Sequence, residues 1–542
     1  MVHQREQWGS RLGLILAVAG NAIGLGNFLR FPVQAADNGG GAFMIPYMIS
    51  FILLGIPLVW VEWALGRYGG ERGHGTAVGV FGLIWKNRIG RYVGILGVLI
   101  PLVVVVYYTY IEAWTLIYSF YHLIDNVPHP SNIHNVKEYL KPFSDMLFNI
   151  IGANSKNELF YSVPITTYIF FLITLFLNFY ILYKGVSAGI EKIAKIAMPL
   201  IFIMAIVLMI RVFTLTAPDG SGRNLLDGLG FLWNPDLSAL SEPKVWIAAA
   251  GQIFFTLSIG FGAILTYASY LKPKSDVVLN GLASASVNEF AEVILGGSIA
   301  ITASVIFFGV AGTQFIASKG AFDLGFIALP AIFSNTPYGS FFGFLWFLLL
   351  FFAGITSSVA LAQPVIAFLE DELDLSREKA VFYTGIFLFV SAHLPIFLKG
   401  FLDELDFWVG TFSLVIFALL EAITFVWLLG KDEVLKKVEG LPLGEKLKLF
   451  ILETPKYAWD ELNRYAEIKV PKIFYYILAY VSPLFLIFLL TWWTITELPS
   501  KIIPQNINGW FARGFILLVI VIGIILINKA YSSSSVIKKK KE

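Results

Sequence analysis

The sequence predicts an all-α polytopic membrane protein with twelve transmembrane helices. Of the 542 residues, 57% are hydrophobic and only 14% are charged, and the mean hydropathy is +0.74. A soluble protein of this size cannot bury so much apolar surface. Tyr and Trp residues also lie near the ends of several apolar runs, as expected at membrane interfaces. The expected spans are 12–36, 42–66, 91–122, 164–184, 190–215, 244–271, 277–310, 339–371, 378–397, 401–429, 471–493 and 510–530.

Composition and motifs exclude several classes of function. The net charge of +2 provides no basic field for nucleic acid, so we expect no such partner. The absence of cysteine excludes disulfides, Cys-ligated metal and thiol catalysis. The sequence contains no HExxH, GxSxG or other catalytic constellation, and we therefore do not expect an enzyme.

Basic residues favour one orientation of the spans. Lys and Arg concentrate in alternate loops, and such loops are normally cytoplasmic. We therefore expect a multi-pass protein of the cell inner (plasma) membrane with both termini in the cytoplasm. The residues on which this depends are Arg5, Arg11, Arg67, Arg72, Lys86, Arg88, Arg91, Lys184, Lys192, Lys195, Lys272, Lys274 and Lys538 to Lys541.

The chain divides into a helical core and smaller flanking parts. The stretch 430–470 is rich in Lys and Glu and is most simply a solvated cytoplasmic connector. Its apolar spacing, Leu435 with Val438 and Leu447 with Phe450, also indicates short amphipathic helices. The expected parts are a cytoplasmic segment 1–11, a ten-helix core 12–429, the connector 430–470, peripheral helices 11 and 12 in 471–530, and a basic cytoplasmic tail 531–542.

The first span contains the most informative stretch, Gly20 to Pro32. It holds three glycines, two asparagines, an arginine and a proline inside an apolar run. An uninterrupted helix is not expected from such a segment. Backbone that leaves the helix inside a membrane is tolerated where it lines an enclosed cavity. The stretch therefore indicates a binding site for an ion or a small polar solute.

A second polar and Gly-rich stretch, Thr256 to Gly262, lies five spans later. Interrupted segments at matching positions of two halves are typical of transporters built from inverted repeats. We therefore predict two five-helix repeats, at about 12–215 and 244–429, with helices 1 and 6 broken.

The two breaks suit a zwitterion and a monovalent cation. Freed amides near Leu25 and Gly26 favour a carboxylate. Freed carbonyls suit a cation or an ammonium group, and neutral side-chain oxygens favour a monovalent ion over calcium. Hydrogen bonding between helices is the alternative role of these side chains. The carbonyls belong to Gly20, Ala22 and Ile23, and the side chains to Asn27, Thr256, Ser258, Asn288, Thr356 and Ser357.

The same stretches closely resemble the neurotransmitter:sodium symporter family, and the similarity covers nearly the whole chain. It is strongest in Gly20–Arg30, Gln34–Pro46, Trp60–Gly70, Gly251–Tyr270, Asn288–Gly297 and Phe351–Glu372. The resemblance implies the LeuT fold, a 5+5 inverted repeat. It also implies a sodium-coupled symporter that imports neutral, mostly aliphatic L-amino acids by alternating access.

Two transported sodium ions are implied by the resemblance. The first is expected at the carbonyls of Ala22 and Thr256, the side chains of Asn27, Thr256 and Asn288, and the substrate carboxylate. The second is expected at the carbonyls of Gly20, Ile23 and Ala353 and the hydroxyls of Thr356 and Ser357.

The resemblance also implies how the substrate binds. Its carboxylate is expected at the amides of Leu25 and Gly26 and the Tyr108 hydroxyl, and its ammonium at the carbonyls of Ala22, Phe255 and Thr256 and the Ser258 hydroxyl. The side-chain pocket is expected at Val104, Tyr108, Phe255, Phe261, Ser357 and Leu361. Leu361 stands where we expect isoleucine in the family's prototype, so the preference among Ala, Leu, Val and Met stays open.

Further positions carry expectations of their own. Monoamine transporters of the family are expected to have aspartate at Gly24, so glycine leaves space that the substrate's carboxylate must fill. Arg30 with Asp406, and Arg5 with Asp371, are expected as gate pairs, although Arg5 could merely set topology. Glu292 is expected to replace the charge of chloride, since it stands where we expect serine in chloride-dependent members. It is also a candidate to take up a proton on the return step. A structural buried glutamate is the alternative.

Alternatives of other classes remain at this point. A sodium-dependent amino-acid sensor that binds without translocating would fit the same site, although no signalling domain is visible. An ion channel fits less well, because paired gates suit a carrier. We expect the partners to be an amino-acid substrate and the lipid bilayer, and the protein to be a monomer or a homodimer. Glu62 is expected to support the broken backbone, and Glu112 has no assigned role.

Overall fold

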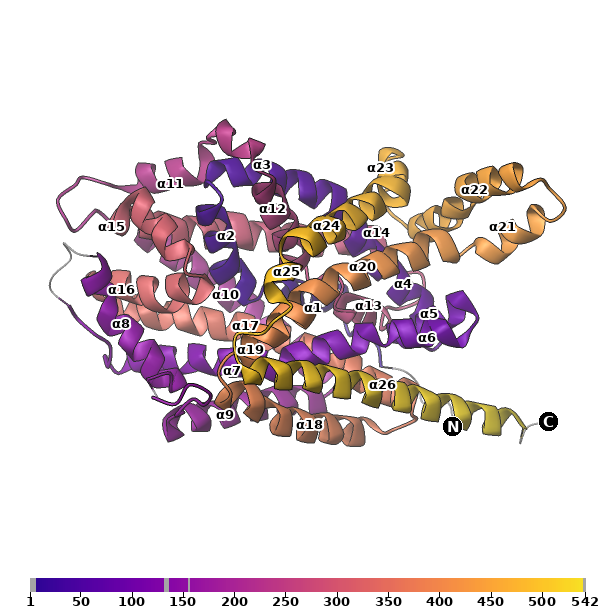
Figure 1. Cartoon of the computed structure of the whole chain (residues 1–542), viewed down its shortest axis with the longest axis horizontal. Coiled ribbons are helices and arrows are strands. Elements are labelled where there is room, and N and C mark those ends of the chain that lie inside the picture. The colour runs from indigo at the N-terminus through magenta and orange to yellow at the C-terminus, as the bar shows by residue number, and fades with distance from the viewer. Residues whose placement is uncertain (1–5, 131–135, 155, 540–542) are drawn as a thin grey trace.

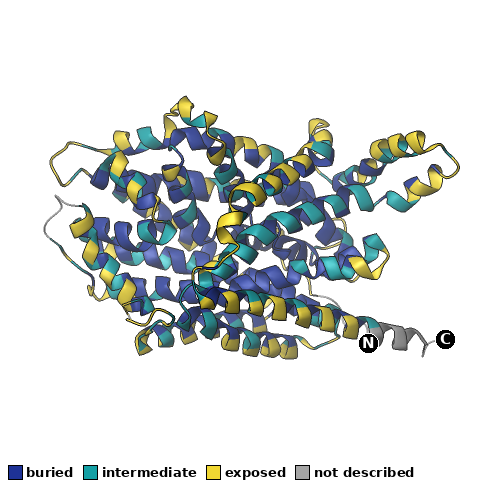
Figure 2. Cartoon of the chain, viewed as in Figure 1, coloured by how far each residue is buried: buried dark blue, intermediate teal, exposed yellow. Residues whose placement is uncertain are grey.

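The computed structural model describes residues 6–130, 136–154 and 156–539. These residues are almost entirely helical, and β-pairing among them is limited to two isolated bridges. The helices form a bundle whose interior is buried (Figure 1). Figure 2 shows exposed residues along the outer helices α18 and α26, and many of these residues are apolar. A bilayer covers such a surface, so the predicted all-α membrane class is confirmed.

The first half of the core contains five spans. In Figure 1 these are α1 with α2, α3 with α4, α7, α9 and α10. The elements are α1 (Arg11–Ala22), η1 (Gly26–Arg30), α2 (Phe31–Asp37), α3 (Gly41–Ser50), η2 (Phe51–Gly55), α4 (Ile56–Gly70), α5 (Ala77–Trp85), α6 (Arg88–Gly94), α7 (Leu96–Leu123), α8 (Val136–Ile151), α9 (Ile165–Tyr183), η3 (Val186–Glu191) and α10 (Lys192–Phe213).

The second half repeats this pattern and adds two more spans. The core elements are α11 (Leu225–Trp233), η4 (Leu237–Ser241), α12 (Pro243–Thr256), α13 (Ala263–Ala268), α14 (Val277–Glu289), η5 (Phe290–Gly297), α15 (Ser298–Ala317), η6 (Asp323–Ala328), α16 (Leu329–Ser334), α17 (Gly339–Asp371), α18 (Arg377–Phe397), α19 (Phe401–Leu405), η7 (Asp406–Phe412), α20 (Ser413–Ile423) and η8 (Thr424–Leu428). The remaining elements are α21 (Lys431–Lys437), α22 (Leu443–Asn463), α23 (Ile473–Tyr476), η9 (Ile477–Val481), α24 (Ser482–Thr496), α25 (Leu498–Lys501) and α26 (Ile507–Lys539).

The spans agree with the predicted number. Within the described residues, ten helices are long and apolar enough to cross a membrane, and α1 with the segment Gly26–Asp37 forms an eleventh, bent span. α12 and α13 form the twelfth segment, which is interrupted by residues 257–262. Boundaries differ where a helix continues beyond its apolar run. The tenth span, for example, runs on to Lys437.

Connecting elements gather at the two ends of the bundle. α8, α11 and α16 lie at one end in Figure 1, and α5, α6, α21 and α22 lie at the other. α8 belongs to the long loop between α7 and α9. The Tyr139 hydroxyl of α8 donates a hydrogen bond to the Ala331 carbonyl of α16 at 2.7 Å. This contact fixes α8 as a cap on that end.

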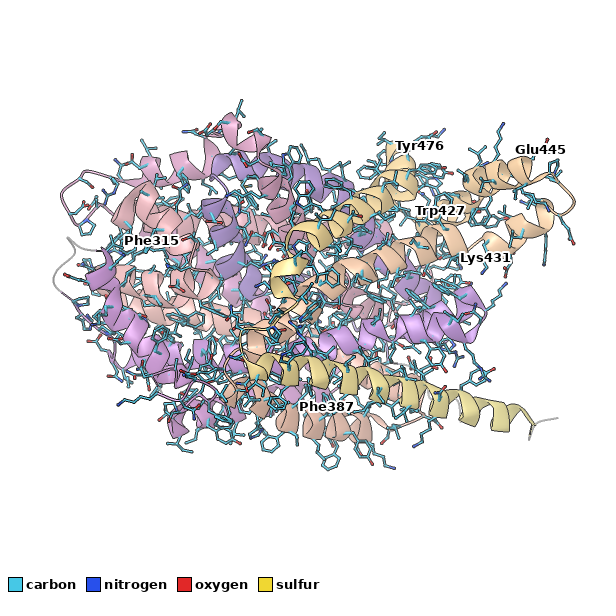
Figure 3. The ribbon with its side chains drawn as sticks, in the orientation of Figure 1. Phe315, Phe387, Trp427, Lys431, Glu445 and Tyr476 are labelled. Carbon is cyan, nitrogen blue, oxygen red and sulfur yellow. The ribbon has the colours of Figure 1, made fainter. Side chains whose placement is uncertain are left out.

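The connector between spans 10 and 11 is a helical arm. Figure 3 shows Lys431 at the base of the arm and Glu445 farther out. The inner end of α22 packs on the bundle, where buried Arg67 donates hydrogen bonds to Glu461 Oε1 at 2.9 Å and to the Arg464 carbonyl at 2.7 Å. The base of the connector is therefore held on span 2 instead of being freely solvated.

The faces of the arm differ in part from the predicted ones. Val438 is buried, and Phe450 stacks on Trp427 with ring centroids 6.3 Å apart. Leu435 and Leu447, however, are 50% and 58% exposed. Helical spacing alone does not define which turn of a helix meets the bundle, and here the aromatic ring of Trp427 sets the contact for α22.

Close backbone approaches hold the interrupted spans in place. A Cβ atom built on Gly66 of α4 would lie 2.2 Å from the Leu265 carbonyl oxygen of α13. A Cβ on Gly296 of η5 would lie 2.2 Å from the Asn27 carbonyl oxygen of η1. Only glycine allows helices to approach so closely. These two residues therefore fix where the second segment of each broken span lies.

We expect Gly66→Ala to destabilise the protein by about 1–3 kcal/mol, because the added methyl group must displace the backbone of α13. The measurement is thermal unfolding of the purified protein in detergent. Gly514→Ala is the matched control, since nothing lies within 4 Å of a Cβ at that helical glycine. Equal melting temperatures for G66A and G514A would contradict the close approach of α4 and α13.

Candidate functional site

The first break begins where α1 ends at Ala22. Ile23 leaves the helical conformation (φ −76°, ψ 88°), and the two parts of the span are bent by 47°. Side-chain oxygens accept hydrogen bonds from the backbone amides that the break frees. Gly24 N donates to Asn27 Oδ1 at 2.9 Å, and Leu25 N donates to the Tyr108 hydroxyl at 3.2 Å. The predicted interruption is confirmed, and Tyr108 of α7 lies directly at one of its amides.

The second break follows α12. Ser258, Gly260 and Gly262 all have positive φ angles, of 55°, 80° and 69°. A Cβ on Gly260 would lie 2.4 Å from the Leu414 carbonyl oxygen, so a larger residue does not fit. The buried Glu62 accepts a hydrogen bond from Gly260 N at 2.7 Å through its Oε1 atom. This contact confirms the expectation that Glu62 supports the broken backbone.

Three side chains form a polar cluster between the breaks. Asn27 Nδ2 lies 2.8 Å from Asn288 Oδ1 and 3.2 Å from Thr256 Oγ1, and Asn288 Nδ2 lies 2.9 Å from the same Thr256 oxygen. All three residues are at most 1% exposed. The structure therefore brings together the side chains predicted for the first sodium ion. Their neutral oxygens can coordinate an alkali cation.

The residues predicted for the second sodium ion lie where α1 meets α17. Ser357 Oγ lies 3.3 Å from the Gly20 carbonyl oxygen, and Thr356 Oγ1 lies 3.1 Å from the Ala353 carbonyl oxygen. A Cβ on Gly20 would lie 3.2 Å from Thr356 Cβ, which shows how closely the two helices approach. Ile23 follows directly on the end of α1. The Ser357 contact thus joins the two spans, whereas the contact between Thr356 and Ala353 lies within α17.

A cavity of about 320 Å³ lies between the two breaks. This volume is in the range that small-molecule sites occupy. The cavity is lined by all the residues that were predicted to bind the substrate: Ala22, Leu25, Gly26, Val104, Tyr108, Phe255, Thr256, Ser258, Phe261, Ser357 and Leu361. It continues past them toward Arg30, Gln34, Phe322, Asp403 and Asp406.

The predicted gate between Arg30 and Asp406 is not closed in this structure. Both residues line the cavity, but no ion pair joins them within the described part of the chain. The Arg30 guanidinium lies 4.4 Å above the Phe255 ring, and Asp406 accepts a hydrogen bond from the Tyr107 hydroxyl at 2.7 Å. The bridge is therefore not formed in this conformation, where each residue has a partner on its own side of the cavity, and the gate stays a prediction.

The second predicted gate lies partly outside the described residues, since Arg5 is not among them. Asp371 accepts a hydrogen bond from Gly75 N at 2.7 Å. Trp8 Nε1 donates to the Tyr267 carbonyl at 2.9 Å, and Trp8 N lies 3.4 Å from the Tyr270 carbonyl oxygen. The segment before α1 thus packs against α13.

Glu292 stands next to the first polar cluster. Its carboxylate accepts hydrogen bonds from the Tyr47 hydroxyl at 2.9 Å, from Gln252 Nε2 at 3.0 Å and from the Thr256 hydroxyl. Glu289 shares the Tyr47 hydroxyl at 2.7 Å. A fixed negative charge at Glu292 would therefore act on the cluster through Thr256, as expected of a substitute for chloride.

Asn21 has no role that is evident from the sequence, although the residue lies within the first Gly-rich stretch. Its side-chain amide is buried, and neither polar atom has a hydrogen-bond partner among the described residues. Its backbone carbonyl accepts hydrogen bonds from the hydroxyls of Ser258 at 3.1 Å and Ser357 at 3.2 Å. A buried amide without a partner is costly, so a ligand in the adjoining cavity is the natural partner. Its polarity inside an apolar run was the available signal.

Sequence comparison relates most of the chain to known transporters. A family model described as the sodium:neurotransmitter symporter family matches residues 5–453. An uncharacterized sodium-dependent transporter of Methanocaldococcus jannaschii is 31% identical over 493 residues, covering 89% of each chain. The sodium-dependent serotonin transporter of Drosophila melanogaster is 28% identical over 481 residues, covering 82% of this chain and 73% of that protein.

Structural comparison agrees with this relationship. The crystal structure of MhsT in complex with L-phenylalanine matches with a TM-score of 0.69 and 27% identity, covering 90% of this chain and 99% of that chain. The match supports the LeuT fold with its two broken spans. The relatives from Methanocaldococcus jannaschii and Drosophila melanogaster are both described as sodium-dependent transporters. The chain belongs to the sodium:neurotransmitter symporter family.

Proposed function

We propose that this protein is a sodium-coupled symporter that imports neutral, mostly aliphatic L-amino acids by alternating access. The observation that carries the proposal is the cavity between the breaks, where amides, carbonyls and neutral hydroxyls meet. The amides of Leu25 and Gly26 would bind the substrate carboxylate with the Tyr108 hydroxyl. The Ser258 hydroxyl and the carbonyls of the second break would bind its ammonium group.

The walls of the cavity support a neutral substrate. Val104, Phe261 and Leu361 are apolar and at most 4% exposed. The charged residues of the cavity, Arg30, Asp403 and Asp406, belong to its extension away from the breaks. A charged substrate side chain would therefore lose its hydration beside the apolar residues without gaining a partner. MhsT, whose crystal structure contains L-phenylalanine, provides a precedent for a neutral amino acid in a related transporter.

Sodium coupling would follow from shared ligands. The substrate carboxylate would complete the coordination of a sodium ion at Asn27, Thr256 and Asn288. Each charge would offset the desolvation of the other, which costs several kcal/mol per ion when unpaired. Binding of either ligand would then favour the other, and this linkage is reciprocal. A second sodium ion would bridge α1 and α17 and hold the first break against Thr356 and Ser357.

Alternating access would use the two gate regions. The separation of Arg30 from Asp406 supports access from the end of the bundle that carries α8 and α11. Closing the bridge would occlude the substrate on that side. Release would require the segment around Trp8 to leave α13, at the end where basic loops predict the cytoplasm. Both termini would then lie in the cytoplasm.

We expect uptake of radiolabelled neutral amino acids into proteoliposomes to require an inward sodium gradient. A panel that includes Ala, Leu, Val, Met and Phe identifies the preferred substrate. Amines made by removing the carboxylate should compete far more weakly, because the amides at the first break would lose their anion. Uptake that is indifferent to sodium would contradict symport. Sodium-dependent binding without uptake or exchange would instead identify a sensor.

We expect Gly24→Ala to weaken amino-acid binding. A Cβ there would lie 2.7 Å from Ser357 Oγ and 3.0 Å from the Tyr108 hydroxyl oxygen, so the space is narrower than expected from the sequence. Displacing these groups by overpacking costs about 1–3 kcal/mol, or roughly five- to 150-fold in affinity. Equilibrium binding of the preferred amino acid measures it. The control is Gly251→Ala, where a Cβ meets nothing within 4 Å. An unchanged affinity in G24A would show that Ser357 and Tyr108 move aside without cost, which would contradict the prediction.

We expect transport by the wild type to be independent of chloride and transport by Glu292→Ser to depend on it. The substitution removes the negative charge beside Thr256 and leaves room for an anion. Uptake with chloride or gluconate as the external anion is the measurement. Glu289→Gln is the matched control, because it alters the neighbouring carboxyl group that also contacts Tyr47. E292S transport that is active and indifferent to chloride would refute this role of Glu292.

A further inference from the structure

Glu112 is a buried acid that the proposed transport mechanism does not use. It lies on α7, one helical turn after Tyr108, and is 0% exposed. Its carboxyl oxygens contact Asn178 of α9 and Ser358 of α17. Within the described residues, no Lys, Arg or His forms an ion pair with it. An acid in this position inside a membrane bundle is costly when ionised and is a candidate for function.

The hydrogen bonds around Glu112 require one more hydrogen than an ionised carboxylate allows. Ser358 Oγ lies 2.6 Å from Asn178 Oδ1, 2.9 Å from Glu112 Oε2 and 3.3 Å from the Ile355 carbonyl oxygen. A serine hydroxyl has a single hydrogen to donate. If that hydrogen points to Asn178, no hydrogen lies between the Ser358 oxygen and an ionised Glu112 oxygen, and two acceptors face each other at 2.9 Å. If it points to Glu112, two acceptor oxygens face each other at 2.6 Å.

Reversing the Asn178 amide does not remove this deficit. The atom assigned as Nδ2 lies 3.2 Å from each Glu112 carboxyl oxygen and 3.1 Å from the Thr174 carbonyl oxygen. An amide oxygen in its place would face three acceptors. A protonated carboxyl group resolves the problem. Glu112 donates to Ser358, Ser358 donates to the Asn178 oxygen, and the Asn178 amide donates to Glu112 and Thr174. Every donor then has an acceptor.

We propose that Glu112 binds an exchangeable proton, and that this proton links sodium binding to pH. The hydrogen-bonded ring joins α7, α9 and α17 behind the cavity. On α7 it lies next to Tyr108, which accepts the Leu25 amide, and on α17 it lies next to Ser357. Loss of the proton leaves an unpaired charge in the core and breaks the ring. The link to sodium rests on the proposed function, whereas the presence of the proton does not.

The groups packed against Glu112 leave it as the titrating member of the ring. α9 contributes Thr174 and Asn178, and α17 contributes Ser358 and the close backbone of Gly354, where a Cβ would lie 3.1 Å from Glu112 Cγ. None of these side chains titrates. On α7 itself the neighbouring titratable group is Tyr108, whose hydroxyl faces Leu25. A pH effect that passes through the ring is therefore carried by Glu112.

Infrared difference spectroscopy of the full-length protein in lipid nanodiscs tests for the proton directly. We expect the spectrum of wild type minus Glu112→Gln to contain the carbonyl band of a protonated carboxylic acid, shifted in D₂O. We expect Glu292→Gln, the control, to retain this band. Absence of the band from the wild-type minus E112Q difference would overturn the proposal. If E112Q does not fold, Ser358→Ala is the second variant. It removes one hydrogen bond from the acid and should shift the band, and an unshifted band would also overturn the proposal.

Binding of radioactive sodium alone, without amino acid, tests the linkage. The binding-competent state contains the proton, so affinity is full at low pH and falls as the pH rises through the titration of Glu112. The limit for one proton is about tenfold per pH unit. E112Q should keep the wild-type affinity at low pH and lose this part of the pH dependence. Glu453→Gln, a control on α22 outside the transport core, should retain the pH dependence. An identical pH profile in wild type and E112Q would refute the linkage. Failure of amino-acid uptake would bear only on the proposed function.

Discussion

Main-chain groups released by two broken spans are the constraint on which this structure depends. A carbonyl or amide that leaves a helix inside a membrane bundle must find a partner, because no bulk water reaches it. The amides of Gly24, Leu25 and Gly260 donate hydrogen bonds to the side chains of Asn27, Tyr108 and Glu62, respectively. These partners come from different spans. The breaks therefore fix the relative positions of α4, α7 and the interrupted helices, and with them the walls of the cavity.

The local parts of this arrangement could be predicted from the sequence. A cluster of Gly and Asn residues inside an apolar run cannot form a stable spanning helix, whatever surrounds it, so both breaks were predicted at the right residues. The cavity lining followed from the family resemblance. The Glu112 ring could not be predicted, because Asn178 and Ser358 lie far away in the chain and ordinary Asn and Ser residues give no pairing signal.

Two other differences arise from tertiary structure and conformation. Leu435 and Leu447 have the spacing of a buried face but are exposed. The contact of α22 with the bundle is made at Trp427. The spacing of apolar residues along a helix does not specify which of its turns contacts a neighbouring helix. Arg30 and Asp406 have the charges of a closing pair, but a sequence does not state which conformation of a carrier is populated. In this structure the cation–π contact with Phe255 and the hydrogen bond from Tyr107 satisfy the two residues separately.

Buried acids stand one layer behind the proposed ligands, and this placement suits a carrier. Glu62 contacts the backbone of the second break, Glu292 contacts Thr256, and Glu112 lies behind Tyr108 and Ser357. A carboxylate in direct contact with sodium would strengthen binding and slow release, whereas transport needs a site that both fills and empties. Neutral oxygens in contact with the ion, with charge placed behind them, give affinity that can be adjusted. The proton proposed at Glu112 acts differently: it keeps intact the hydrogen-bonded ring behind Tyr108 and Ser357, and its loss would disrupt that ring without any competition for the coordination sites.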